Sequence, residues 1–184
     1  MQKAIWTAAA FLAVSGSTAM ASLQATGLLT RTATSPNNTY AITLNSTGTT
    51  TVGSFWYAWI PGQDYLATSP LTVSSPPNWS SFITGFPSSS NGYGIQWFAN
   101  SPADYIPIGG SKSGFGFTSL DSYASVSGNS IFYPSTPVGT SFVYSQGLFS
   151  DAGYQFVVAS APIPEPTALA LVTPALLLLR RRNG

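Results

Sequence analysis

Carboxylates are the first side chains to consider for chemistry, because the chain contains no histidine and no cysteine. Hydrolysis of a glycosidic bond usually takes two carboxyl groups, about 5 Å apart or somewhat farther. Between residues 22 and 163 the chain offers Asp64, Asp104, Asp121 and Asp151, each within a stretch typical of a turn. Aspartate in a turn commonly accepts hydrogen bonds from nearby backbone N–H groups. We therefore predict structural roles for all four and no catalytic pair.

Nucleophilic and metal chemistry also find little support. The absence of histidine and cysteine excludes His-based triads, thiol nucleophiles and Cys/His zinc sites. Lys112 stands between Ser111 and Ser113, but a lysine base must be desolvated to lose its proton. It follows a Gly-Gly pair typical of a loop, so we expect a solvated lysine. The sequence has no acidic cluster of the calcium-binding kind, and we predict no metal, no cofactor and no catalytic residue.

Aromatic side chains are better candidates for a binding function, since exposed rings can stack on sugars. The central region contains Trp56, Trp59, Trp79 and Trp97. Three of them lie in segments that we expect to be strands, where large aromatic side chains usually fill the core. Trp79 instead follows a Pro-Pro-Asn turn. It is therefore the tryptophan that we expect to be most exposed, and the candidate for stacking on a glycan; the alternative is that it plugs one end of the sandwich.

The region that must position these residues has the composition of a strand-rich domain. It is rich in Ser, Thr, Gly, Pro and aromatic residues, and clusters of turn residues separate short apolar or alternating segments. We expect strands at Tyr40–Leu44, Val52–Ile60, Tyr93–Phe98, Ser113–Thr118, Ser141–Ser145 and Tyr154–Ala159, and weaker ones at Leu71–Val73, Ser80–Thr84 and Ala124–Val126. This spacing predicts an all-β fold over residues 22–161, an antiparallel β-sandwich of the immunoglobulin-like kind.

Charge is scarce and lies mostly at the two ends of the chain. Only 6% of the 184 residues are charged, against about 25% in an average soluble protein. Of the six basic residues, Lys3 lies near the start and Arg180, Arg181 and Arg182 lie near the end. The remaining two basic residues face five acidic ones, a balance of −3. A nucleic-acid-binding protein needs a cationic surface, so this class is excluded.

Residues 1–21 have the order of a secretory signal peptide. A lysine is followed by an apolar stretch over residues 4–14, which is shorter than the roughly 20 residues that span a bilayer. Small and polar residues then end in Ala19-Met20-Ala21, an A-x-A site that predicts cleavage before Ser22. We expect export by Sec-type machinery and processing by signal peptidase. A buried N-terminal helix is the alternative.

Residues 162–184 carry three features in series. Pro164-Glu165-Pro166 is a rigid, extended tripeptide, because proline fixes φ and disfavours helix in the residue before it. Residues 168–179 are apolar, and as a helix they reach about 18 Å, short of the roughly 30 Å of a hydrocarbon core. The arginine cluster that follows would stay on the cytoplasmic side of a membrane.

This order of tripeptide, apolar run and arginine cluster resembles the PEP-CTERM sorting domain of exported proteins in Gram-negative bacteria. In that family an exosortase, a membrane transpeptidase, recognises the tripeptide, cleaves there and moves the protein to the cell surface or the extracellular polymer. The resemblance implies that Pro164, Glu165 and Pro166 are recognition residues and that Arg180–Arg182 are the cytoplasmic stop. Pro174 departs from an uninterrupted apolar helix. A plain C-terminal anchor that is never cleaved is the alternative.

The sequence as a whole predicts a non-enzymatic, exported protein. We expect transient anchoring in the inner membrane through residues 168–179, followed by delivery to the cell surface or extracellular matrix, with an exosortase as partner. A carbohydrate-binding module is the alternative, in which exposed aromatics such as Trp79 bind extracellular polysaccharide. An enzyme would instead require two of the aspartates to converge in a cleft.

Overall fold

The chain folds into short strands, as the computed structural model shows for residues 21–34, 36–85, 91–147 and 149–161. The strands are β1 (Ala25–Ala33), β2 (Asn38–Ser46), β3 (Ser54–Tyr57), β4 (Trp59–Ile60), β5 (Gln63–Asp64), β6 (Thr72–Ser74), β7 (Trp79–Thr84), β8 (Gly94–Ala99), β9 (Ser111–Ser119), β10 (Thr140–Tyr144), β11 (Tyr154–Val157) and β12 (Ala159–Ser160). Two single-turn helices, η1 (Pro102–Asp104) and α1 (Tyr123–Ser127), complete the described elements. The predicted all-β class is confirmed.

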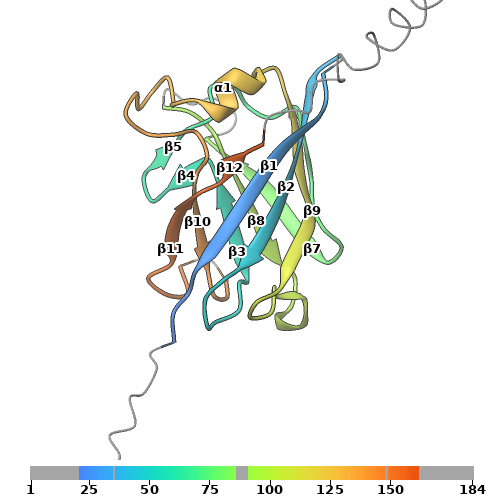
Figure 1. The fold of residues 1–184 in the computed structure, drawn as a ribbon, viewed down its shortest axis with the longest axis vertical. Coiled ribbons are helices and arrows are strands. Elements are labelled where there is room, and N and C mark those ends of the chain that lie inside the picture. Colours follow the sequence, from blue (N-terminus) through green and yellow to red (C-terminus); the bar gives the residue numbers. More distant parts are fainter. Residues whose placement is uncertain (1–20, 35, 86–90, 148, 162–184) are drawn as a thin grey trace, which may run out of the picture.

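Two five-stranded sheets pack face to face (Figure 1). The first sheet has the order β12-β1-β2-β9-β6, and the second has the order β11-β10-β3-β8-β7. Strands β4 and β5 form a separate two-stranded pair. Neighbouring strands are antiparallel, except that β12 runs parallel to β1. The chain therefore passes from the second sheet to the first between β11 and β12.

Aromatic rings from both sheets meet in the core between them. Phe55 of β3 stacks on Trp97 of β8 with ring centroids 5.4 Å apart, and both rings meet Phe115 of β9 edge-on at 5.5 Å. All three side chains are fully buried. The Trp97 indole N–H also donates to the carbonyl of Ser74 in β6 at 2.9 Å, which joins the second sheet to the edge of the first. Because the chain has no cysteine, packing of this kind holds the sheets together.

Most predicted strands coincide with observed ones, and one predicted strand is replaced by a helical turn. The segment Ala124–Val126 was expected to be a strand, but it lies in α1. The hydroxyl of Ser122 accepts a hydrogen bond from the backbone N–H of Ser125 at 3.2 Å, which caps a helical turn at this point. Val126 is the buried residue of α1, and Tyr123 of the same turn packs against the core as a partly buried side chain.

Strand β1 is absent from the sequence-based prediction, although it is one of the longest strands. Its buried positions are Ala25, Gly27 and Leu29, and two of these three side chains are small. Leu28 lies between them and is exposed, so the adjacent leucines hide the alternation. The strand pairs with β2, the next strand in the chain, over almost its whole length, and hydropathy does not reveal this pairing.

Two buried tyrosines provide a matched test of stability. The Tyr40 hydroxyl donates to the carbonyl of Asp121 at 2.7 Å, whereas the Tyr57 hydroxyl has no partner among the described residues. We expect Tyr40→Phe to lower the free energy of unfolding by about 1–3 kcal/mol, because it leaves a carbonyl unpaired. Tyr57→Phe should raise it by about 1 kcal/mol, because it removes an unpaired buried hydroxyl. Denaturant titration measures both changes in the free energy of unfolding. Changes of the same sign would contradict a paired Tyr40 hydroxyl and an unpaired Tyr57 hydroxyl.

Tyr40 and Tyr57 also predict how the stability of the domain changes at alkaline pH. Burial raises the pKa of Tyr40 to about 12 and also raises the pKa of Tyr57. In the unfolded chain a tyrosine ionises near pH 10, so the folded state holds these protons more tightly. The contribution of these two tyrosines to the free energy of unfolding is thus fully present below pH 10, and it falls as the pH rises from 10 towards 12. The double phenylalanine variant should lose less stability over this interval than the parent.

Candidate binding surface

The four aspartates do not form a shared site. Each accepts hydrogen bonds from its own neighbours: Asp64 from Thr84, Asp104 from Asn78 and Ser101, Asp121 from the Thr68 N–H, and Asp151 from Ser145 and the Gly153 N–H. Asp64 lies in β5 rather than in the predicted turn. Within the described ranges no three acidic side chains gather as a metal site would need. The arrangement fits local structural roles for these carboxylates.

Asp64 and Asp104 lie in different electrostatic settings. Burial raises the pKa of Asp64, and the hydrogen bond from Thr84 opposes this effect. Hydrogen bonds from Ser101 and Asn78 lower the pKa of Asp104, and the nearby charge of Lys112 acts in the same direction. The two carboxyl groups are thus held by different hydrogen-bond partners, and their pKa values shift in opposite directions.

Lys112 lies in β9, not in the loop that the sequence predicts. Its ammonium group donates to the backbone carbonyl of Asp104 at 3.4 Å and lies 5.5 Å from the centre of the Trp79 ring. The side chain is half-buried. Its polar contact is thus made with Asp104, and Lys112 serves to cover Trp79.

Trp79 is buried, which corrects the prediction that it is exposed. Only 5% of its surface is accessible, its indole N–H donates to the carbonyl of Asp104 at 3.0 Å, and its ring meets Phe115 edge-on. Asn78 has a φ of 63°, and this left-handed residue turns the chain so that Trp79 begins β7 with its ring in the core. The other tryptophans of the described region are also buried. Trp79 therefore offers no ring face to a sugar.

A second group of aromatic rings covers the outer face of the second sheet. Trp56 and Phe142 alternate along β3 and β10 with residues of the core, so their side chains point the other way. Trp59 joins them because Ala58 has a φ of 54° and interrupts the alternation. The predicted continuous strand Val52–Ile60 is thus broken into β3 and β4. We name this group the outer aromatic face; its members are Trp56, Trp59, Phe82, Phe142, Tyr144 and Phe149.

The outer aromatic face has buried rings at its centre and exposed rings at its rim. Trp56 and Trp59 stack with ring centroids 3.9 Å apart, and both are buried. Phe82 meets Trp56 edge-on at 5.9 Å, and Phe149 lies 6.4 Å from Trp56 and 6.3 Å from Trp59. Phe82 is 47% exposed and Phe149 is 60% exposed. Two phenylalanine rings therefore meet solvent above a tryptophan pair.

Polar atoms without partners lie within the same face. Gln96 of β8 stands opposite Trp56 on one side and Phe82 on the other. It lines a hollow of about 260 Å³ together with Phe82, Phe98, Ala99 and Gly147. Gln96 is only 2% exposed, yet its Oε1 has no hydrogen-bond partner in the described structure, and neither has the Nε1 of Trp56. Buried polar groups are normally paired, so both unpaired atoms are unusual, and Gln96 is the residue of the two that lines the hollow.

Comparison with known proteins gives no relative for this chain. No family model matches it, and neither does any curated protein or solved structure. The function must therefore be inferred from the residues and their geometry.

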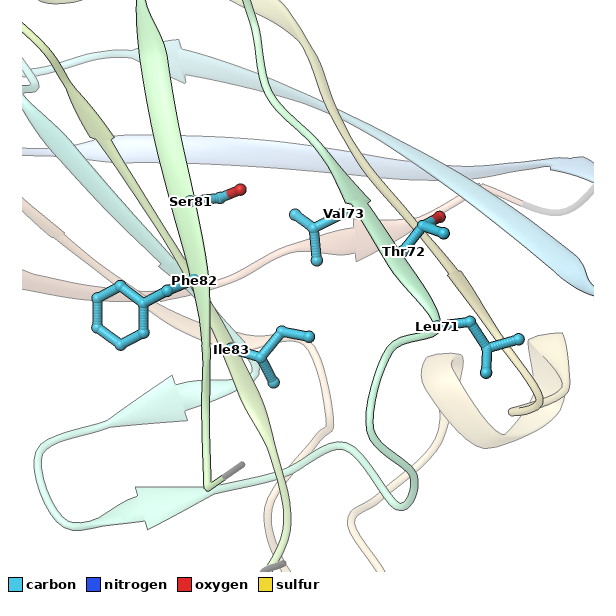
Figure 2. A pocket seen from close by; sticks show the side chains of 6 residues that line it. All are labelled: Leu71, Thr72, Val73, Ser81, Phe82 and Ile83. Atoms are coloured by element: carbon cyan, nitrogen blue, oxygen red, sulfur yellow. The ribbon is translucent and has the colours of Figure 1, made fainter. Parts of the chain in front are cut away.

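A larger groove of about 460 Å³ runs between β6 and β7, the edge strands of the two sheets. In Figure 2, Ile83 points into this groove from β7, while Phe82 points to the other side of the strand. The hydroxyls of Thr72 and Ser81, which line it, already have hydrogen-bond partners. The groove is mostly apolar and these two hydroxyls are already hydrogen-bonded, so it indicates no particular ligand.

Most of the predicted targeting residues lie outside the part of the chain that the structure describes. These are Ala19, the tripeptide Pro164-Glu165-Pro166, the apolar run 168–179 and Arg180–Arg182. Ala21 and Ser22 are described, and the Ser22 N–H donates to the Thr49 hydroxyl at 2.7 Å. Among the described residues no helix has the length and hydropathy needed to cross a membrane.

Proposed function

We propose that this chain is an exported, non-enzymatic surface or extracellular-matrix protein of a Gram-negative bacterium, sorted by an exosortase-type transpeptidase. The observation that carries the proposal is the order Pro-Glu-Pro, short apolar run and arginine cluster in residues 162–184. The described core residues run from Ala25 to Val158, between the two proposed targeting segments.

In this proposal each end of the chain has its own partner. The Sec-type machinery exports the chain and signal peptidase cleaves after Ala21. Residues 168–179 then hold the protein in the inner membrane until the exosortase acts at the tripeptide. The backbone of Ser22 is hydrogen-bonded to the β2–β3 connection, so a chain beginning at Ser22 keeps that contact. The mature protein is then located at the cell surface or in the matrix.

We further infer an immunoglobulin-like arrangement for the two sheets, flanked by a signal helix and a short C-terminal apolar helix. Antiparallel pairing throughout both sheets, apart from the β1–β12 pair, supports this inference. The crossing of the chain between the sheets after β11 supports it as well.

Mass spectrometry of the mature protein from a Gram-negative host with an exosortase tests the sorting proposal. We expect an N-terminus at Ser22 and a C-terminus near residues 164–166. A host without an exosortase is the control, and there the C-terminal residues should be retained. A protein with an intact C-terminus in both hosts would contradict sorting and favour the plain anchor.

Binding of extracellular polysaccharide is a second candidate function. The outer aromatic face favours it, since this surface combines exposed rings with unpaired polar atoms. Trp79 has no part in it, because its ring is buried.

A further inference from the structure

We propose that the outer aromatic face binds a neutral polysaccharide, with Phe82 and Phe149 as stacking rings and Gln96 as the polar contact in the hollow beside Phe82. This inference deepens the second proposed function and does not depend on how the chain is sorted. It moves the predicted glycan contact from Trp79 in the core to the opposite side of the second sheet.

The two phenylalanines have the exposure that stacking requires. The C–H face of a sugar ring packs against an aromatic ring when both rings can lose water on contact. Phe82 and Phe149 leave about half of their surface open, and Trp56 lies next to both. The buried pair of Trp56 and Trp59 packs beneath these two exposed rings, because Trp59 stacks on Trp56 and also contacts Phe149. A ligand would thus meet rings whose positions are fixed by packing.

The backbone at Phe149 is consistent with this placement. Its φ is 54°, in the left-handed region that residues other than glycine seldom adopt. Such a conformation costs free energy and persists only where the surroundings fix it. Contacts with Trp56, Trp59 and Tyr144 hold the ring in place here. The result is an exposed aromatic ring that packs against three other rings.

Gln96 supplies what a sugar hydroxyl needs. Its Oε1 lacks a partner in the described structure, and an unsatisfied buried oxygen is costly. The terminal amide of glutamine turns about a soft torsion, so either its oxygen or its nitrogen can face the hollow. A hydroxyl, which both donates and accepts, can pair with either atom. Binding sites of this kind combine aromatic walls with a few polar groups that orient the ligand.

The charge of the face selects the class of polymer. None of the five strands of the second sheet, β11, β10, β3, β8 and β7, contains a charged residue, and the described residues Asp151 near Tyr144 and Asp64 bonded to Thr84, which lie beside the face, are acidic. An acidic polysaccharide would lose its hydration here without gaining a cation as partner. We therefore infer a neutral, hydroxyl-rich chain rather than an anionic one.

Native gel electrophoresis in polysaccharide-containing gels tests the proposal. The full chain is expressed in a Gram-negative host, and the protein that accumulates is purified. Hydroxyethyl cellulose and galactomannan serve as neutral probes, and polygalacturonate serves as the anionic control. We expect at least one neutral polymer to retard the protein and polygalacturonate to leave its mobility unchanged.

Three substitutions locate the binding surface. Phe82→Ala and Phe149→Ala should each weaken the apparent affinity by about threefold to tenfold, as expected for loss of one ring contact. Gln96→Leu should weaken it without lowering the midpoint of thermal unfolding, because leucine removes the unpaired buried Oε1. Leu120→Ala is the matched control: Leu120 is 65% exposed and outside this face, and its loss should change nothing.

Three results would overturn the inference. The first is free migration through both neutral gels, and the second is retardation that none of the three substitutions weakens. The third is concentration-dependent dimerisation in sedimentation experiments that Phe82→Ala and Phe149→Ala abolish, since it would assign the face to a second copy of the chain. Failure of sorting, read from the termini by mass spectrometry, would leave the gel result unchanged.

Discussion

Replacement of Trp97 by alanine is expected to lower the free energy of unfolding by about 3–5 kcal/mol. The side chain is fully buried, stacks on Phe55 and meets Phe115 edge-on. Alanine would leave a cavity between the sheets and would also remove the indole hydrogen bond to Ser74. Single domains are stable by only about 5–15 kcal/mol, so this variant should be close to unfolding at ambient temperature.

Denaturant titration measures the loss, and Trp97→Phe is the control for it. Phenylalanine keeps an aromatic ring against Phe55 and Phe115 but cannot donate to Ser74. We expect its loss of stability to be clearly smaller than that of the alanine variant. A loss below about 1 kcal/mol for Trp97→Ala would show that this ring is not the main contact between the sheets.

Replacement of Pro164, Glu165 and Pro166 by alanines should have the largest effect on sorting. The proposal assigns recognition to this tripeptide, so the variant should stay uncleaved and remain with the membrane fraction. The parent protein should instead be found at the cell surface or in the matrix. Cell fractionation with an antibody against residues 22–161 distinguishes the two distributions.

Pro162→Ala provides the matched control for this experiment, because it removes a nearby proline outside the tripeptide. It should be sorted like the parent. If the triple variant reached the surface with the same efficiency as Pro162→Ala, the tripeptide would not be the recognition element. The sorting proposal would then fail, whatever the outer aromatic face binds.

Local sequence patterns predicted the strands in which buried and exposed residues alternate. They did not predict features that depend on contacts with other strands. Tyr40, Ile42 and Leu44 lie on one face of β2 as their spacing predicts. Strand β1 has small buried residues and an exposed leucine, so its place depends on pairing with β2. Trp79 follows a turn, as predicted, but the left-handed Asn78 directs its ring inward. Turn composition does not reveal that direction.

The outer aromatic face had a partial signal in the sequence. The segment Val52–Ile60 is apolar at nearly every position, which predicts a strand buried on both faces. The outward side is in fact covered by Phe142, Tyr144 and Phe149, which lie about 90 residues later in the chain. The break at Ala58 was not predictable either, since alanine rarely adopts a positive φ. The covering of the outward side arises from the pairing of β3 with β10.

The parallel pairing of β12 with β1 determines how the domain would bear a mechanical load. Ser22 is bonded to the β2–β3 connection, whereas Ala161 is bonded to Tyr123 of α1, at the opposite end of the sheets (Figure 1). Tension between these two points pulls β1 and β12 past each other in shear. The bonds between them, including that from the Ala161 N–H to the Leu29 carbonyl, then resist together rather than opening one after another. A load applied between the two ends of the domain would thus be met by these bonds in shear.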